Sequence, residues 1–168
     1  MDKRVVFAVA GAGKTTRLIN ELDLHNRVLL LTYTENNCAE IRRRVIQRFG
    51  HVPDNITVST YFTFLNSFCY RPLLLVDFKT KGISFERPDP YSSLQKVSSR
   101  SRYVTAGGRI YHARMAKALN AMGRMPAVLG RLERYYDKVF VDEVQDFGGH
   151  DFNLLLQMNA MLVADGRY

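Results

Sequence analysis

The chain has 168 residues, which is enough for one hydrophobic core and a modest insertion. Apolar residues make up 46% of it, as in globular proteins, and no apolar run approaches the roughly 18 residues that a membrane-spanning helix needs. Two cysteines and four histidines without ligand spacing exclude a disulfide framework and a metal cluster built from side chains. So few cysteines favour an intracellular, cytoplasmic location.

The net charge of +8 is concentrated in one segment. Between Lys79 and Arg134, twelve Lys and Arg residues accompany three acidic residues, so this segment carries +9 and the rest of the chain −1. A basic segment beside a near-neutral remainder is typical of an insertion that faces a polyanion such as nucleic acid. A solvated basic surface with no partner is the alternative that charge alone leaves open.

In the first half of the chain, short apolar runs alternate with helical patterns. The runs at 4–9, 27–32 and 56–60 predict strands, and 15–22 predicts a helix. The second strand is wholly apolar over 28–31, as in a parallel strand buried on both faces. The next helix is expected to end at Gly50, and Asn37 with Glu40 has capping-box spacing near its start. An aromatic-rich run follows the third strand.

The second half is less regular at first. Residues 78–108 are rich in Lys, Arg, Ser, Pro and Gly and predict a loop or a loosely packed insertion. Helices are expected at 113–122, 127–136 and 152–158, and strands at 139–141 and 161–164. We therefore predict an α/β fold, a parallel sheet with helices on both faces. Residues 1–76 and 137–168 are expected to form the sheet domain, and 77–136 a basic, mostly helical insertion.

The first strand leads into a glycine-rich turn, AVAGAGKT at Ala8–Thr15. Glycines let backbone N–H groups surround a phosphate, and the helix that follows adds the positive end of its dipole. Lys14 is expected to reach the β- and γ-phosphates of ATP, and the Thr15 hydroxyl to ligate Mg²⁺. The residues predicted to bind the nucleotide are Ala10, Gly11, Ala12, Gly13, Lys14, Thr15 and Thr16.

A second motif, VFVDEVQD at Val139–Asp146, ends a strand in two acidic residues. The carboxyl ends of parallel strands present ligand-facing residues, so Asp142 is expected to hold Mg²⁺ and Glu143 to act as general base on the attacking water. Gln145 is expected to sense the γ-phosphate. The alternative is that these acidic residues only cap a helix that follows the strand. This alternative is less favoured when the motif is considered together with Lys14 and Thr15.

Together these motifs resemble the superfamily 1 DNA helicases of the UvrD/Rep/PcrA type. The family's phosphate loop reads Ala-Gly-x-Gly-Lys-Thr, and its acidic motif reads Asp-Glu-x-Gln-Asp, which 142–146 matches fully. Residues 31–36 resemble the family's motif Ia, and residues 59–64 resemble its motif Ib. The resemblance implies the first RecA-like motor domain of a P-loop NTPase, with ATP and Mg²⁺ as cofactors.

The resemblance also implies a path for single-stranded DNA. The residues it assigns to that path are Thr32, Tyr33, Thr34, Asn36, Thr60 and Tyr61. An aromatic ring offers a base a stacking face, and short hydroxyls reach phosphates. Ordinary packing at a strand end is the alternative for both tyrosines. The basic segment occupies the place of the family's subdomain that contacts duplex DNA.

The chain departs from the family pattern in several places. Seven residues before Ala8 leave no room for the adenine-recognition motif, Phe62 replaces the histidine of motif Ib, and 163–168 resembles only the start of motif III. The family's second RecA-like domain carries arginines that stabilise the transferring phosphoryl group, an effect worth about 10³–10⁵ in rate in related NTPases. We therefore expect a motor-domain fragment that depends on a second RecA-like domain or a partner subunit and has little activity alone.

Two other functions are compatible with the motifs. A stand-alone module that binds nucleotide and nucleic acid would receive its arginines from a partner subunit. A small P-loop nucleotide kinase would need an arginine-rich lid, for which Arg100, Arg102 and Arg109 are available. The Asp-Glu-x-Gln-Asp motif argues against the kinase, because a kinase has no use for a base that activates water.

Overall fold

A computed structural model describes residues 14–164 of the chain. The strand predicted at 4–9 and the glycine turn from Ala10 to Gly13 lie outside this range. Within it, three parallel strands form the main sheet in the order β2 (Ile56–Thr60), β1 (Val28–Thr32), β5 (Lys138–Val141). The strands predicted at 27–32, 56–60 and 139–141 and the α/β class are confirmed.

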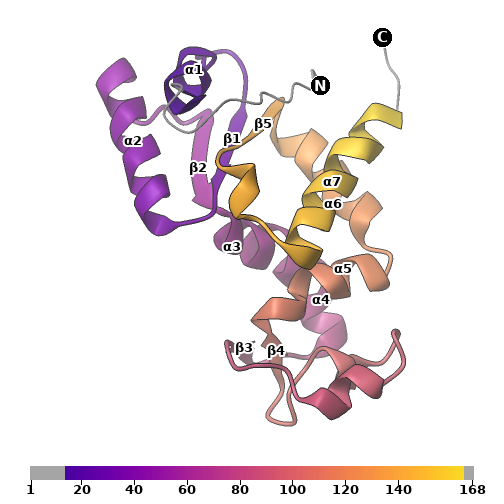
Figure 1. The fold of residues 1–168 in the computed structure, drawn as a ribbon. Helices are drawn as coiled ribbons and strands as arrows, with labels where there is room; N and C mark the ends of the chain where they lie inside the picture. The colour runs from indigo at the N-terminus through magenta and orange to yellow at the C-terminus, as the bar shows by residue number, and fades with distance from the viewer. Residues whose placement is uncertain (1–13, 165–168) are drawn as a thin grey trace.

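Helices cover both faces of the sheet, because side chains alternate along the central strand β1. Val28 and Leu30 pack against α1 (Lys14–Asn20) and α2 (Glu35–Phe49), the helices on one side in Figure 1. Leu29 and Leu31 face a larger core on the other side. That core contains residues of α5 (Met115–Ala121), α6 (Met125–Tyr135) and α7 (Gly149–Ala164). A strand buried on both faces explains the uninterrupted apolar run in its sequence.

Helix α2 begins earlier than its sequence suggested. Thr34 is the N-cap, and its hydroxyl accepts a hydrogen bond from the backbone N–H of Asn37 at 3.1 Å. The capping-box assignment to Asn37 and Glu40 is therefore wrong, because Glu40 pairs with arginines one turn further on. The predicted end is confirmed: Gly50 takes a left-handed φ of 80° that a residue with a Cβ adopts only with strain.

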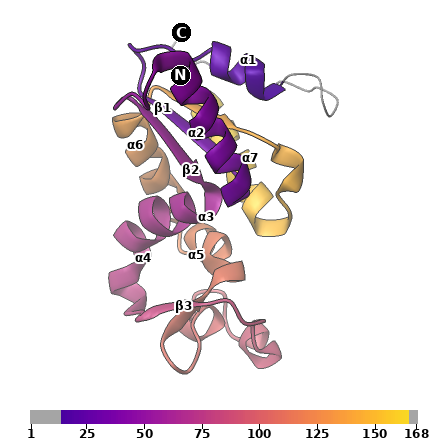
Figure 2. The same ribbon diagram turned by 90° about the vertical axis from the view of Figure 1, so that its left-hand side faces the viewer.

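A long helical segment connects the sheet to the insertion. The aromatic run after β2 forms α3 (Tyr61–Thr63), the π-helical turn η1 (Phe64–Tyr70) and α4 (Arg71–Phe78) in unbroken succession. Thr60 caps its start by accepting a hydrogen bond from the backbone N–H of Thr63. This segment lies beneath the sheet in Figures 1 and 2 and carries the chain away from it.

The insertion is more ordered at its tip than the loop predicted for 78–108. The parallel strands β3 (Gly82–Ser84) and β4 (Arg109–Tyr111) pair there, and the short 3₁₀ turns η2 (Pro90–Leu94) and η3 (Arg100–Arg102) lie between them. Another turn, η4 (His112–Arg114), leads into α5. The tip lies at the end of the molecule away from the main sheet (Figure 2). Its buried Tyr103 and Ile110 belong to the same core as Leu29, so the insertion is not loosely packed.

The strand predicted at 161–164 is wrong, since α7 continues through Ala164. A four-residue apolar run does not distinguish a strand from the end of a helix. Upstream, Leu154, Leu155 and Met158 are buried at helical spacing, and the helix simply extends past them. The likeness of 163–168 to the start of motif III is therefore not accompanied by a strand at 163–164.

No helix in the described range 14–164 has the length and apolar character needed to cross a lipid bilayer.

Candidate functional site

Thr15 and Asp142, from the two motifs predicted to bind ATP and Mg²⁺, meet at the carboxyl edge of the main sheet. The Thr15 hydroxyl, in the first turn of α1, donates a hydrogen bond to Asp142 Oδ2 at 3.2 Å, across 127 positions of sequence. Asp142 directly follows β5, is only 7% exposed, and its backbone N–H donates to the Leu31 carbonyl at 2.8 Å. P-loop nucleotide sites use a hydroxyl and a carboxylate placed this close together to hold Mg²⁺.

Arginines of α2 fix α1 beside this edge. Arg44 donates to the Thr16 hydroxyl at 3.2 Å and to Glu40 at 2.7 Å, and Arg48 donates to the carbonyl of Ile19. Thr16 was predicted to bind nucleotide, and in the structure its hydroxyl accepts this bond from Arg44. A cavity of about 340 Å³ lies between the two helices beside these arginines. Sequence reasoning did not single out Arg48.

The predicted general base and the predicted phosphate sensor contact each other. The Gln145 side-chain amide donates a hydrogen bond to the Glu143 carboxylate. Glu143 takes a left-handed φ of 53°, which costs a non-glycine residue roughly 1–3 kcal/mol. Such strain persists where the surroundings hold a side chain in one direction, as in many active sites. Gln145 therefore lies where it can orient the predicted base.

The threonines assigned to the DNA path have structural contacts. Thr32 and Thr60 are buried at the ends of their strands. Thr32 donates to the Thr34 carbonyl at 3.2 Å, while Thr34 and Thr60 cap α2 and α3. Asn36 is exposed on the first turn of α2. These residues thus lie at one sheet edge, but the hydroxyls of the three threonines are hydrogen-bonded to backbone groups.

The two tyrosines of the predicted path differ. Tyr33 is 46% exposed, whereas Tyr61 is buried, so the packing interpretation fits Tyr61 and the stacking prediction stays with Tyr33. Phe147 lies between them, edge-on to both, with centroid distances of 5.2 Å to Tyr33 and 5.0 Å to Tyr61. Sequence reasoning missed Phe147, although it directly follows the acidic motif.

Tyr61 is also held by a partly buried carboxylate that the sequence did not reveal. Its hydroxyl donates to Asp151 Oδ1 at 3.1 Å. Burial raises the pKa of the Asp151 carboxyl, and burial together with that carboxyl raises the pKa of Tyr61. This bond ties the start of α7 to the start of α3, and so couples the segment after the acidic motif to the predicted DNA path.

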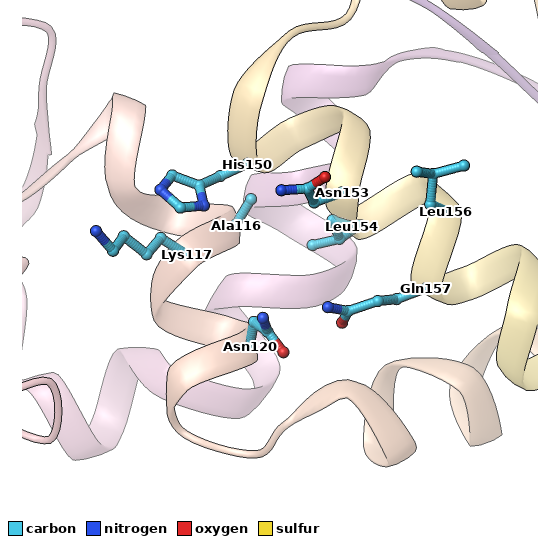
Figure 3. Close-up of a pocket in the computed structure, with 8 residues that line it drawn as sticks. All are labelled: Ala116, Lys117, Asn120, His150, Asn153, Leu154, Leu156 and Gln157. Carbon is cyan, nitrogen blue, oxygen red and sulfur yellow. The ribbon is translucent and has the colours of Figure 1, made fainter.

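A separate pocket lies between α5 and α7 (Figure 3). Its volume is about 260 Å³, and amide side chains of both helices line it together with Lys117 and His150. None of the predicted ATP residues contributes to it. Within the described part of the chain, no group of three or more His, Cys, Asp or Glu side chains has the arrangement of a metal site.

Comparison of the chain with protein-family models, curated proteins and solved structures gave no match.

Proposed function

We propose that this chain is the ATP-binding motor domain of a DNA helicase-like ATPase of the RecA-like P-loop class. The observation that carries the proposal is the 3.2 Å hydrogen bond between Thr15 and Asp142. These residues come from the two motifs that, from sequence alone, were expected to share one Mg²⁺. The parallel sheet supports this interpretation, because its carboxyl edge is where α/β folds bind ligands.

The chemistry follows from the positions of these groups. Thr15 would bind Mg²⁺ directly and Asp142 would hold it through water, while Lys14 would neutralise the β- and γ-phosphates. Mg²⁺ would supply charge neutralisation at the phosphates. Glu143, oriented by Gln145, would accept a proton from the attacking water. Asp142 is buried, which lowers the local dielectric and strengthens its attraction for a cation.

Nucleic acid is the proposed second ligand. The half-exposed Tyr33 lies at the carboxyl end of β1, and the basic insertion follows the other end of the α3–α4 segment. An exposed aromatic ring can stack on a base, and a cationic surface can bind phosphates, so the two together fit single-stranded DNA. The Tyr61–Asp151 bond and Phe147 connect the segment after the acidic motif with Tyr33 and with the start of α3, giving ATP and DNA a physical route to influence each other.

The test is binding of a fluorescent, non-hydrolysable ATP analogue with and without Mg²⁺. Asp142→Asn is expected to weaken Mg²⁺-dependent binding about tenfold or more, since a charge-assisted contact contributes roughly 1.5–3 kcal/mol. Asp137→Asn is the matched control, because Asp137 precedes the same strand at its opposite, amino end and pairs with Arg27. The control should bind like the wild type.

Equal loss in both variants would show that the effect is structural and would contradict the proposed site. Analogue binding that does not depend on Mg²⁺ would contradict it as well. Fast ATP turnover by the chain alone, with transfer to a nucleoside monophosphate, would favour the kinase over the motor domain.

A further inference from the structure

Three aromatic rings from separate parts of the chain meet where the insertion contacts α3. Phe62 comes from α3, Phe85 follows β3, and His112 begins η4. The centroid distances are 5.0 Å for Phe62–His112, 5.1 Å for Phe85–His112 and 5.7 Å for Phe62–Phe85. We call these three residues the aromatic platform.

Phe85 is the exposed member of the platform. Its side chain is 72% exposed, although its ring stacks on His112 with an interplanar angle of 28°. A ring left this exposed gains little from hydrophobic burial. Its contacts with His112 and Phe62 nevertheless fix its orientation, so a ligand that stacks on it loses little conformational entropy in the side chain.

The surroundings of the platform are cationic. Tyr111 adjoins His112, and the Arg114 guanidinium lies 5.4 Å from the Tyr111 ring centre. Burial, with the nearby charge of Arg102 also contributing, lowers the pKa of both Arg114 and Lys117. The Arg114 guanidinium donates hydrogen bonds to the hydroxyls of Ser92 and Ser93, so it contributes positive charge to the insertion from a fixed position.

The acidic groups near the platform have hydrogen-bond partners within the protein. Glu86 follows Phe85, and its carboxylate accepts a hydrogen bond from the Ser84 hydroxyl at 3.5 Å. The Asp89 carboxylate accepts one from the backbone N–H of Tyr91 at 2.9 Å. Asp151, whose carboxyl is bonded to Tyr61, is held at a raised pKa mainly by burial. The exposed Arg87 adds a further cation two residues from Phe85.

We propose that Phe85, supported by His112 and Phe62, stacks on an unpaired base of single-stranded DNA while neighbouring arginines contact the phosphates. An exposed, oriented ring within a positive field fits this ligand, since every base has a π-face and every nucleotide a negative charge. The inference rests on the proposed DNA-binding function. It adds Phe85 and His112 of the insertion, which the sequence motifs do not include, to Phe62 of the run that resembles motif Ib.

The experiment is fluorescence anisotropy of a labelled oligothymidine with the full chain at low salt. Phe85→Ala should weaken binding about 5- to 150-fold, the range for loss of one base–aromatic stack. Phe85→Trp should restore binding to at least the wild-type level. Tyr91→Ala is the matched control. Tyr91 is similarly exposed on the insertion, at 75%, and within residues 14–164 its ring packs against no other aromatic ring. It should change binding by less than about twofold.

An oligomer of abasic deoxyribose phosphate separates stacking from charge. It should bind the wild type and Phe85→Ala equally, because it has no bases to stack.

ATP-analogue binding is measured on the same samples. If oligothymidine binds but Phe85→Ala has no effect, the platform is wrong and the proposed function stands. If the analogue does not bind but oligothymidine binding depends on Phe85, the platform stands and the ATP site is wrong. If oligothymidine does not bind at all, the platform and the proposed DNA role are both wrong.

Discussion

The carboxyl edge of the main sheet and the tip of the insertion present opposite kinds of surface. At the sheet edge, short polar side chains such as Thr15 and Asp142 contact one another and are partly or wholly buried. At the insertion, large rings and arginines such as Phe85 and Arg87 are exposed. The first arrangement suits a small ion held at fixed distances, and the second suits a long, flexible polyanion. One core nevertheless extends beneath both regions.

The shared core gives the largest expected effect. Leu119 of α5 is fully buried in the core that reaches both the sheet and the insertion. Leu119→Ala should lower the free energy of unfolding by about 2–5 kcal/mol through lost burial and a cavity. Urea unfolding measures the change, and both ligands should bind less well near the melting temperature. Leu94→Ala, at a leucine 81% exposed on the insertion, is the control and should cost less than about 0.5 kcal/mol. Equal effects would show that burial of Leu119 in this core does not stabilise the fold.

Lys14→Ala should weaken ATP binding at the sheet edge without affecting DNA binding at the insertion. Lys14 begins α1 directly after the glycine turn. Loss of its proposed charge-assisted contacts with the β- and γ-phosphates is expected to weaken binding of the ATP analogue by roughly 10- to 100-fold. Oligothymidine binding without nucleotide should stay unchanged, because the platform lies on the insertion. Titrating both ligands against the same preparation checks this. A parallel loss of DNA binding would mean that the two surfaces are not independent.

Arg87→Gln tests the charge of the insertion and should have a smaller effect. A single phosphate contact contributes a slope of about 0.7 to the dependence of log K on log salt for single strands. The variant should therefore weaken oligothymidine binding a few-fold and reduce the salt slope by about that amount. Asp142→Asn should leave the slope unchanged. Binding measured at several salt concentrations distinguishes a phosphate contact from a loss of fold.

The smallest effect concerns acid stability. Hydrogen bonds from Arg27 lower the pKa of Asp137 from 3.8 to about 2, and those from Arg43 and Arg44 lower the pKa of Glu40 from 4.5 to about 2. Because the folded pKa values are depressed, these groups stabilise the fold above about pH 4.5, and the contribution is lost as the pH falls towards 2. Both groups are exposed, so solvent screening keeps the effect small. The urea midpoint of wild type should fall more between pH 5 and pH 3 than that of Asp137→Asn, and equal falls would contradict the assignment.

Much of the sheet could be predicted because its signals are local. The apolar run Val28–Leu31 reflects burial on both faces, and the left-handed Gly50 marks the end of α2. The errors arose where local signals were ambiguous. Met161–Ala164 is too short a run to distinguish a strand from the end of α7. Asn37 and Glu40 have the spacing of a capping box, but Thr34 is the residue at the N-cap position of α2.

The sequence by itself determined where the apolar runs that form the strands lie along the chain and which motifs follow them. It also determined the concentration of positive charge at 79–134. These features depend on residues that are neighbours in the chain. The tertiary structure decided which distant groups meet: Thr15 with Asp142, Phe147 with both tyrosines, and Phe85 with His112 and Phe62. Such contacts depend on strand order and helix packing, which no local pattern encodes, and the proposed ATP and DNA surfaces both consist of them.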